Sequence, residues 1–365
     1  MKHMRTRIAA FIPASRAPSR WRRTAPVALR LSALTGVLLI LAGCVHRPLI
    51  NLHDNISFLD PQGPIAAAER WHFWFVIAVL VVLVAGPVFL FTTLIVWRYR
   101  YSNRAHARYQ PKWGDSKPVT VLTWAGPIAI VIVLGFFVWQ NTHQLNPFTP
   151  LAADHLTAVA SSQAPLQIQA IGYDWKWLFV YPKLRIASVG VLPIQAGRPV
   201  AMQLTSATVM QSLGIPALVG QIYAMGGMTT QLHFEATNPG RSLGMNTMYN
   251  GRGFSQQKFT TIAMKPAAFK AWVRSVRSNG IKLNAGAYKL LNERNTKSGL
   301  AAALELPATS IRDGTVYFRN VPPHLFARVV RATMHGVPVN LNQPAGVSPG
   351  MQPNAAPPAV AVAEN

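Results

Sequence analysis

Two long apolar stretches without a charged residue, 73–97 and 119–139, constrain the fold of this 365-residue chain more than any other feature. Each has about the 20 apolar residues that a helix needs to cross the hydrocarbon core of a membrane. Pro87 and Pro127 lie inside the stretches, and we expect a local kink at each because proline lacks a backbone N–H donor. The sequence therefore predicts two transmembrane helices, with tryptophans at the membrane–water interface: Trp71, Trp74, Trp97 and Trp139.

The short segment between the two stretches is strongly basic. It carries six lysines and arginines between Arg98 and Lys117, against Asp115 as its one acidic residue. Basic loops of membrane proteins are retained on the cytoplasmic side. We therefore expect this loop in the cytoplasm and both ends of the mature chain on the outer side of the membrane.

The composition narrows the class of protein. Half of the residues are hydrophobic and 13% are charged, which is typical of a chain with membrane segments. The net charge of +24 would suit a nucleic-acid-binding protein. However, much of the excess lies in the first 43 residues and the basic loop, and the rest is scattered without an aromatic RNA-binding motif. We expect no nucleic-acid partner.

The single cysteine, Cys44, has a distinctive setting. A basic leader and the apolar run 31–41 precede Leu41-Ala42-Gly43-Cys44, which resembles a bacterial lipoprotein signal with cleavage before Cys44 and acylation of its sulfur. The alternative is an uncleaved signal anchor with an ordinary buried cysteine. One cysteine also excludes an intrachain disulfide and a cluster of thiolate metal ligands.

Beyond residue 142 the pattern changes from apolar to strand-like and then to helical. Alternating segments at 165–171, 200–205, 232–236 and 259–264 predict a β-sandwich or barrel. From Pro266 onward apolar residues recur at helical spacing, and the Pro- and Ala-rich end has little to bury. The predicted organisation is a signal peptide at 1–43, an outer N-terminus with two membrane helices at 44–142, a β-domain at 143–265, a helical extension at 266–342 and a disordered tail at 343–365.

No catalytic set is visible in the sequence. There is no phosphate-binding glycine loop, no nucleophile elbow and no compact histidine spacing for a metal. Four methionines could suggest a thioether copper site, although such clusters more often pack a core: Met225, Met228, Met245 and Met248. We assign no catalytic and no metal-binding residue to this chain.

Two motifs carry a family resemblance. Residues 172–182 read G-Y-D-W-K-W-L-F-V-Y-P, and residues 209–259 contain M-Q-S-L-G-I-P and M-N-T-M-Y-N-G-R-G-F-S-Q-Q-K-F. With the lipoprotein cysteine, the two spans and the helical extension, residues 44–335 resemble subunit II of the haem–copper terminal oxidases, in the bo-type ubiquinol oxidase branch. The resemblance implies a periplasmic cupredoxin-like β-sandwich that follows an N-terminal transmembrane hairpin.

The second motif matches the frame of a binuclear copper site. In the cytochrome c branch of the family, this frame binds copper through thiolates, imidazoles, a thioether and a backbone carbonyl. None of the matching residues offers a thiolate or an imidazole, and a copper pair needs soft bridging sulfur. The resemblance therefore implies a copper-free subunit, with these residues at the former ligand positions: Gln211, Asn246, Met248, Asn250, Phe254 and Gln257.

The resemblance also implies roles for single residues. Asp174, Trp175 and Trp177 belong to the signature strand, either as subunit-interface residues or as aromatic packing at the rim of the sandwich. Thr120 stands where ubiquinol-type relatives often carry a carboxylate near a proton channel, so a direct proton-entry role for this chain is in doubt.

At the level of the complex, the resemblance implies a proton-pumping enzyme of the bacterial inner membrane that oxidises ubiquinol and reduces oxygen to water. Haem and copper are expected in subunit I, and no cofactor in this chain. The expected partners are subunit I, other small oxidase subunits and membrane lipid, with ubiquinol reached through the complex. Two alternatives stay open: a copper-bearing cytochrome c oxidase subunit II, and a free-standing membrane lipoprotein that binds a ligand or scaffolds the envelope.

Overall fold

The computed structural model describes residues 57–100, 114, 116–149, 151 and 164–341. The predicted signal peptide, Cys44, most of the basic loop and the predicted tail lie outside these residues. The predictions made for those segments therefore stay predictions.

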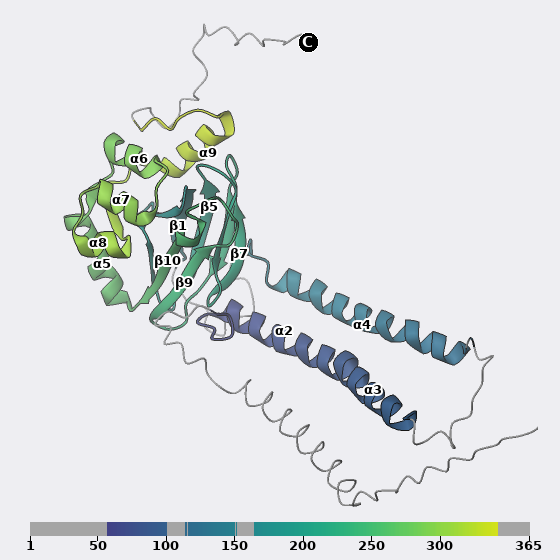
Figure 1. The fold of residues 1–365 in the computed structure, drawn as a ribbon. Helices are drawn as coiled ribbons and strands as arrows, with labels where there is room; N and C mark the ends of the chain where they lie inside the picture. The colour runs from purple at the N-terminus through teal and green to yellow at the C-terminus, as the bar shows by residue number, and fades with distance from the viewer. Residues whose placement is uncertain (1–56, 101–113, 115, 150, 152–163, 342–365) are drawn as a thin grey trace, which may run out of the picture. The chain divides into compact units, whose positions relative to one another are not determined.

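The first apolar stretch lies in a helical segment that runs from Pro64 to Arg98 and is 35 residues long. It consists of α2 (Pro64–Leu80), the π-helical segment η1 (Val81–Ala85) and α3 (Gly86–Arg98) (Figure 1). The π-helical segment ends at Ala85, two residues before Pro87, which cannot donate a backbone hydrogen bond. The kink predicted at this proline stays a prediction. The helix begins before the predicted span because Ile65 and Ala66 are buried.

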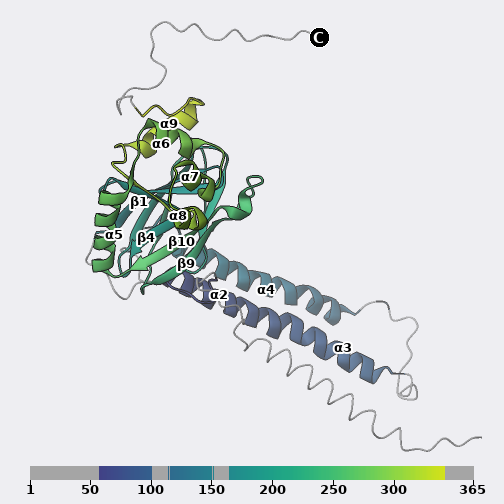
Figure 2. The same ribbon diagram turned by 60° about the vertical axis from the view of Figure 1, so that its left-hand side comes forward.

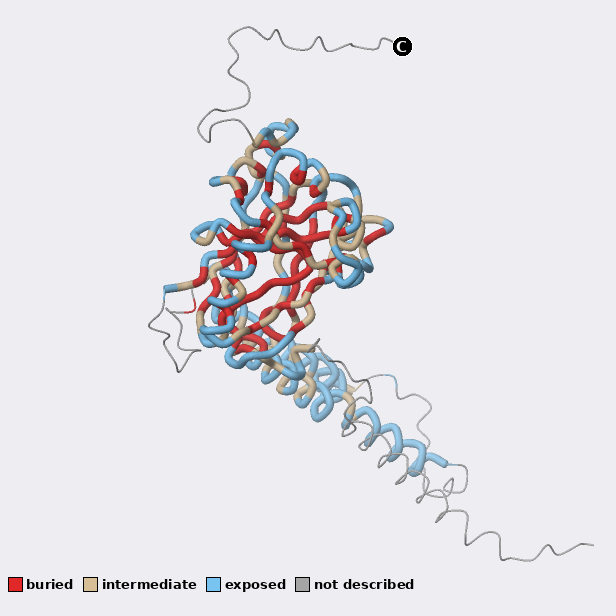
Figure 3. Tube along the Cα trace, turned by 90° about the vertical axis from the view of Figure 1, so that its left-hand side faces the viewer, coloured by how far each residue is buried: buried red, intermediate tan, exposed pale blue. Residues whose placement is uncertain are grey.

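The second apolar stretch lies in α4 (Lys117–Gln144), which continues through Pro127. Phe75 of α2 and Phe137 of α4 stack with ring centroids 4.2 Å apart, and the two helices run side by side in Figures 1 and 2. Their most apolar windows have no buried residue, as the exposed colouring of the helices in Figure 3 shows. The prediction of two helices long and apolar enough to span a membrane is confirmed.

Residues 164–341 contain two packed β-sheets. The seven-stranded sheet has the order β11-β12-β3-β2-β1-β5-β8, and the five-stranded sheet has the order β4-β10-β9-β6-β7. The strands are β1 (Leu166–Tyr173), β2 (Lys176–Tyr181), β3 (Ile186–Val189), β4 (Val191–Gln195), β5 (Val200–Ser206), β6 (Gln211–Ile215), β7 (Val219–Ala224), β8 (Thr230–Phe234), β9 (Gly240–Asn246), β10 (Lys258–Met264), β11 (Ile281–Lys282) and β12 (Val316–Arg319). The predicted architecture, two helices long and apolar enough to span a membrane followed by a β-sandwich, is confirmed.

The four strands expected from alternation correspond to β1, β5, β8 and β10. β1 pairs with β5 in parallel and with β2 antiparallel, so β1 lies inside the sheet. The observed bounds differ from the predicted ones by up to two residues: β1 extends to Tyr173 instead of residue 171, and β8 is Thr230–Phe234 instead of 232–236. After Phe234 the chain leaves the ladder to contact the start of α2.

The sandwich has apolar cores on both faces of its larger sheet. Ile168, Phe179 and Phe259 belong to the core between the two sheets, where the rings of Phe179 and Phe259 lie 4.8 Å apart. Ile171 and Leu178 belong to a second cluster, on the opposite face, that the extension helices cover. Alternate residues of β1 therefore serve different cores, as expected for a strand buried on both faces.

The extension contains α5 (Pro266–Asn279), α6 (Ala285–Asn292), α7 (Lys297–Ala303), α8 (Ala308–Asp313) and α9 (Leu325–His335). The helices expected here are present, but the segment is not purely helical. β11 and β12 also come from it, and β12 pairs antiparallel with β3. The extension therefore completes the larger sheet, a feature that the helical spacing of the sequence did not predict.

Both membrane helices are attached to the sandwich near the end of β8. Gln62, just before α2, donates its N–H to the carbonyl of Ala217 at 2.7 Å and accepts from the N–H of Thr237 at 2.9 Å. Just after α4, the carbonyl of Pro147 accepts from the N–H of His233 at 3.2 Å. One short segment, 233–237, thus contacts the residues just before α2 and just after α4.

Candidate functional site

The residues at the former ligand positions converge at one end of the sandwich. Gln211 begins β6, Asn246 ends β9, and Gln257 immediately precedes β10. These three side chains are 0%, 3% and 1% exposed. Asn250 lies on the loop between β9 and β10 and is partly buried. These four residues therefore lie together, and each carries an amide side chain.

These four amides, Gln211, Asn246, Asn250 and Gln257, form what we call the amide cluster. The Oε1 atom of Gln257 accepts from Asn246 Nδ2 at 3.0 Å and from Asn250 Nδ2 at 2.7 Å. The Nε2 atom of Gln257 donates to Gln211 Oε1 at 2.5 Å. Gln257 is therefore the hub through which the other three side chains are joined.

Backbone groups satisfy the outer side of the amide cluster. Gln211 Nε2 donates to the carbonyl of Tyr173 at 3.1 Å. Asn246 Oδ1 accepts from the N–H groups of Ser212 and Met248, each at 3.0 Å, and its Nδ2 donates to the carbonyl of Met248 at 2.8 Å. Asn250 Oδ1 is buried without a partner among the described residues. Buried polar groups need such partners, so the cluster stabilises β6, the end of β9 and the loop before β10 against one another.

The amide cluster does not fit a copper pair. Its side chains offer only amide groups, whereas such a pair needs thiolate and imidazole ligands. Phe254, at another former ligand position, is partly buried, and its ring lies 5.6 Å from that of Tyr249. Met228, one of the methionines considered for a thioether site, is 54% exposed. Among the described residues, no group of three His, Cys, Asp or Glu side chains could hold a metal.

Trp175 of the signature strand covers the amide cluster. It lies in the turn between β1 and β2 with a left-handed φ of 61°, and its Nε1 donates to the carbonyl of Asn250 at 3.2 Å. A Cβ atom added to Gly253 would lie 2.2 Å from Trp175 Cδ2, so the indole lies against this loop. Trp175 of the signature strand thus packs against the loop that carries Asn250.

The other two signature residues differ in their surroundings. Asp174 forms an ion pair of 3.5 Å with Arg294 of the extension, whose guanidinium also lies 5.5 Å from the centre of the Trp175 ring. Trp177 is 2% exposed and belongs to the core between the sheets. The Trp177 ring is therefore core packing in this chain, whereas Asp174 and Trp175 stay partly accessible.

Lys176 lies between these residues and was not singled out from the sequence. It is 2% exposed, and its Nζ donates to Asn295 Oδ1 at 2.7 Å and to the carbonyls of Glu293 and Asn295 at 2.8 and 3.0 Å. Burial lowers the pKa of Lys176 to about 8, and the charges of Asp174 and Glu293 oppose this shift. The sequence offered one signal for this buried lysine: it is the charged residue of an otherwise apolar strand.

Comparisons with known proteins place the chain in a family, although no protein-family model matches it. It is 37% identical to ubiquinol oxidase subunit 2 of Acetobacter aceti over 309 residues, 84% of this chain and 89% of that protein. It is 37% identical to cytochrome bo(3) ubiquinol oxidase subunit 2 of Pseudomonas putida over 72% of this chain and 78% of that protein. Quinol oxidase subunit 2 of Bacillus subtilis is 31% identical over 71% of this chain and 76% of that protein.

Among solved structures, the periplasmic domain of subunit II of cytochrome oxidase from Bradyrhizobium japonicum is similar, with 22% identity and a TM-score of 0.30. The matched region covers 31% of this chain and 94% of that domain. The relatives in sequence described above, and not this structural similarity, show the family. Together with the two apolar helices and the β-sandwich, they define a membrane-anchored subunit of an oxidase complex. The chain belongs to the ubiquinol oxidase subunit 2 family.

Proposed function

We propose that this chain is subunit II of a proton-pumping quinol oxidase of an aerobic respiratory chain, with no redox centre of its own. The complex would oxidise ubiquinol and reduce oxygen to water. Relatives named as quinol oxidase subunits, at 31–37% identity, support the donor class.

The amide cluster is the observation that carries the proposal. Gln211 and Gln257 bond to each other at the centre of the frame in which copper-bearing relatives would hold their metals. An electron from a soluble donor would have no acceptor there. Electrons therefore enter the complex through another subunit, and we assign the haems, the copper at the oxygen site and the quinol chemistry to subunit I.

The surface of the two helices supports a role in assembly. Large apolar side chains on both helices are exposed in the isolated chain, for example Phe89 at 75% and Leu122 at 74%. Such a surface is stable only against lipid or against other membrane helices. We propose that subunit I and membrane lipid cover it, in the bacterial inner membrane, with the sandwich outside and Cys44 acylated.

The proposal assigns no proton-entry role to this chain. Thr120 lies in the first turn of α4, where its N–H donates to the carbonyl of Ser116 at 2.9 Å. A threonine hydroxyl does not ionise near neutral pH, so it cannot collect protons as a carboxylate does. No described feature favours the alternative of a free-standing lipoprotein.

Purification through an affinity tag on this chain tests the proposal. We expect a haem-bearing subunit to co-purify and to give quinol-dependent oxygen uptake. Deletion of the gene for this chain should abolish that activity, and the tagged copy should restore it. Isolation of the chain as a stable monomer, with full oxidase activity left in the deletion strain, would contradict the proposal.

A further inference from the structure

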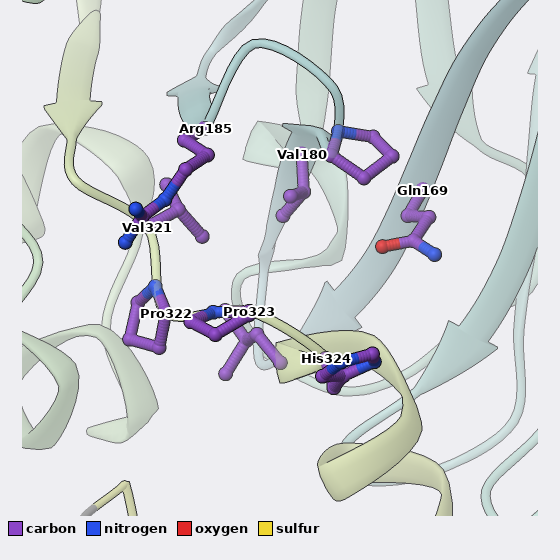
Figure 4. A pocket seen from close by; sticks show the side chains of 9 residues that line it. Gln169, Val180, Arg185, Val321, Pro322, Pro323 and His324 are labelled. Carbon is purple, nitrogen blue, oxygen red and sulfur yellow. The ribbon is translucent and has the colours of Figure 1, made fainter. Parts of the chain in front are cut away.

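A pocket of about 250 Å³ lies at the start of α9, away from the amide cluster. Figure 4 shows Gln169, Arg185 and His324 on different sides of it. They come from three separate segments: β1, the turn between β2 and β3, and the residue that precedes α9. The residues that line the pocket include no aspartate or glutamate.

The two basic residues of this pocket have an unusual backbone. Arg185 has a φ of 55° and His324 a φ of 59°. The left-handed conformation costs a non-glycine residue roughly 1–2 kcal/mol, and such residues concentrate at functional sites. Two of them meet at this one pocket, which indicates that the fold maintains an unfavourable backbone to place these side chains.

Hydrogen bonds and prolines hold the pocket walls in place. The N–H of Val321 donates to the carbonyl of Arg185 at 3.1 Å, which ties the two loops together. Pro322 and Pro323 then restrict the backbone before His324. Gln169 forms an uncharged polar wall, and a hydrogen bond of 3.2 Å from its Nε2 to Gln203 Oε1 holds its side chain. The site is therefore largely formed before any ligand binds, which lowers the entropic cost of binding.

The electrostatics of the pocket select for negative charge. A guanidinium forms strong, charge-assisted bonds to oxyanions, and an imidazole adds a further donor. The adjacent N-terminus of α9 has neither a side-chain cap nor an acidic residue in its first turn. Its helix dipole reinforces the positive potential that Arg185 creates.

We propose that this pocket binds a phosphate-bearing anion through Arg185 and His324. Arg185 supplies a planar fork of donors that matches phosphate oxygens, and the pocket volume suits one phosphate group rather than a large ligand. The phosphate can come from solution or from a phospholipid headgroup. This inference is independent of the oxidase assignment, because binding is measured without electron transfer.

Titration of the full chain in an uncharged detergent tests the proposal, with inorganic phosphate followed by calorimetry in a phosphate-free buffer. Glycerophosphoglycerol, the water-soluble headgroup of phosphatidylglycerol, provides a second arm for the lipid source, because the two apolar helices would insert into vesicles whatever the pocket binds. The variants Arg185→Asn and His324→Asn remove the guanidinium and the imidazole while retaining a residue that tolerates the left-handed conformation. Each should weaken binding about tenfold.

Two further variants keep the result interpretable. Arg274→Gln removes a charge from the exposed face of α5, outside the pocket, and should leave binding unchanged. Gln169→Glu places a negative charge in the pocket without altering a left-handed residue, so it should abolish binding even if an asparagine variant folds poorly.

Saturable binding of phosphate, or of glycerophosphoglycerol alone, that the pocket variants weaken and Arg274→Gln retains would support the proposal and identify the source. Absence of binding in both arms would overturn it. Equal losses for the pocket variants and Arg274→Gln would also overturn it, because they would show attraction to net charge only.

Discussion

Gln257 donates a side-chain hydrogen bond of 2.5 Å to Gln211, a residue 46 positions earlier in the chain. Both side chains are buried. Because Gln257 also accepts from Asn246 and Asn250, one side chain joins β6, the end of β9 and the loop before β10. The loops at this end of the sandwich are thus held together by the chain itself.

Replacing the hub of the amide cluster should destabilise the domain. Gln257→Leu conserves much of the volume but removes the partners of Gln211, Asn246 and Asn250. Leaving buried polar groups unsatisfied costs about 1–3 kcal/mol per group, and groups in one network are not additive. We expect a loss of about 3 kcal/mol in the free energy of unfolding, measured by chemical denaturation in detergent.

The neighbouring residue provides the control. Gln256 is exposed, so Gln256→Leu should change the free energy of unfolding by no more than about 0.5 kcal/mol. Equal effects of the two substitutions would show that the amide cluster contributes no specific stability.

The contact between Trp175 and the loop of the former copper frame should be sensitive to one methyl group. Gly253→Ala would place a Cβ 2.2 Å from Trp175 Cδ2, so the indole must move. Overpacking of this kind costs about 1–3 kcal/mol, and a displaced indole should also change its fluorescence. Gly286→Ala, in helix α6 with ordinary contacts, should instead stabilise the chain by up to about 1 kcal/mol. Unchanged stability and fluorescence in Gly253→Ala would contradict the described packing.

Lys176 should make stability depend on pH in the alkaline range. Burial lowers its pKa to about 8 in the folded chain from an ordinary value of 10.5. Between these values the unfolded chain binds a proton that the folded chain does not, so stability rises with pH. Relative to Lys176→Met, the wild-type chain should gain at most about 3 kcal/mol between about pH 7 and about pH 10.

The matched control for this prediction is Lys183→Met, which removes an exposed lysine from the turn after β2. Its stability should follow the wild-type pH profile, because Lys183 is exposed and this substitution leaves Lys176 and its hydrogen bonds in place. Parallel profiles for the wild type and Lys176→Met would show that Lys176 does not titrate in this window.

The large elements of the fold were accessible from sequence because their signals are local. Apolar length predicted the two helices, and alternation predicted β1, β5, β8 and β10. β12 was missed because four residues, Val316–Arg319, lie among helices, although their burial alternates as in a half-buried strand. Its place beside β3 depends on a pairing across more than 120 positions of sequence, which no local pattern specifies.

For the candidate site, the sequence identified the positions but not their interactions. Gln211 and Gln257 were recognised as unsuitable copper ligands, but their mutual hydrogen bond depends on how β6 and β10 are placed by the sheet. Similarly, Asp174 was singled out while its partner Arg294 lies in a distant loop of the extension. These contacts are set by tertiary structure, which a residue pattern alone does not contain.

Oxygen uptake by the complex purified through this chain is the most direct test of the central claim, which is that electrons bypass this subunit. The same preparation is supplied with ubiquinol or with reduced cytochrome c. We predict oxygen uptake with ubiquinol and none above background with cytochrome c, because the amide cluster offers no electron acceptor. Comparable uptake with reduced cytochrome c, accompanied by a thiolate–copper absorption band, would contradict the account.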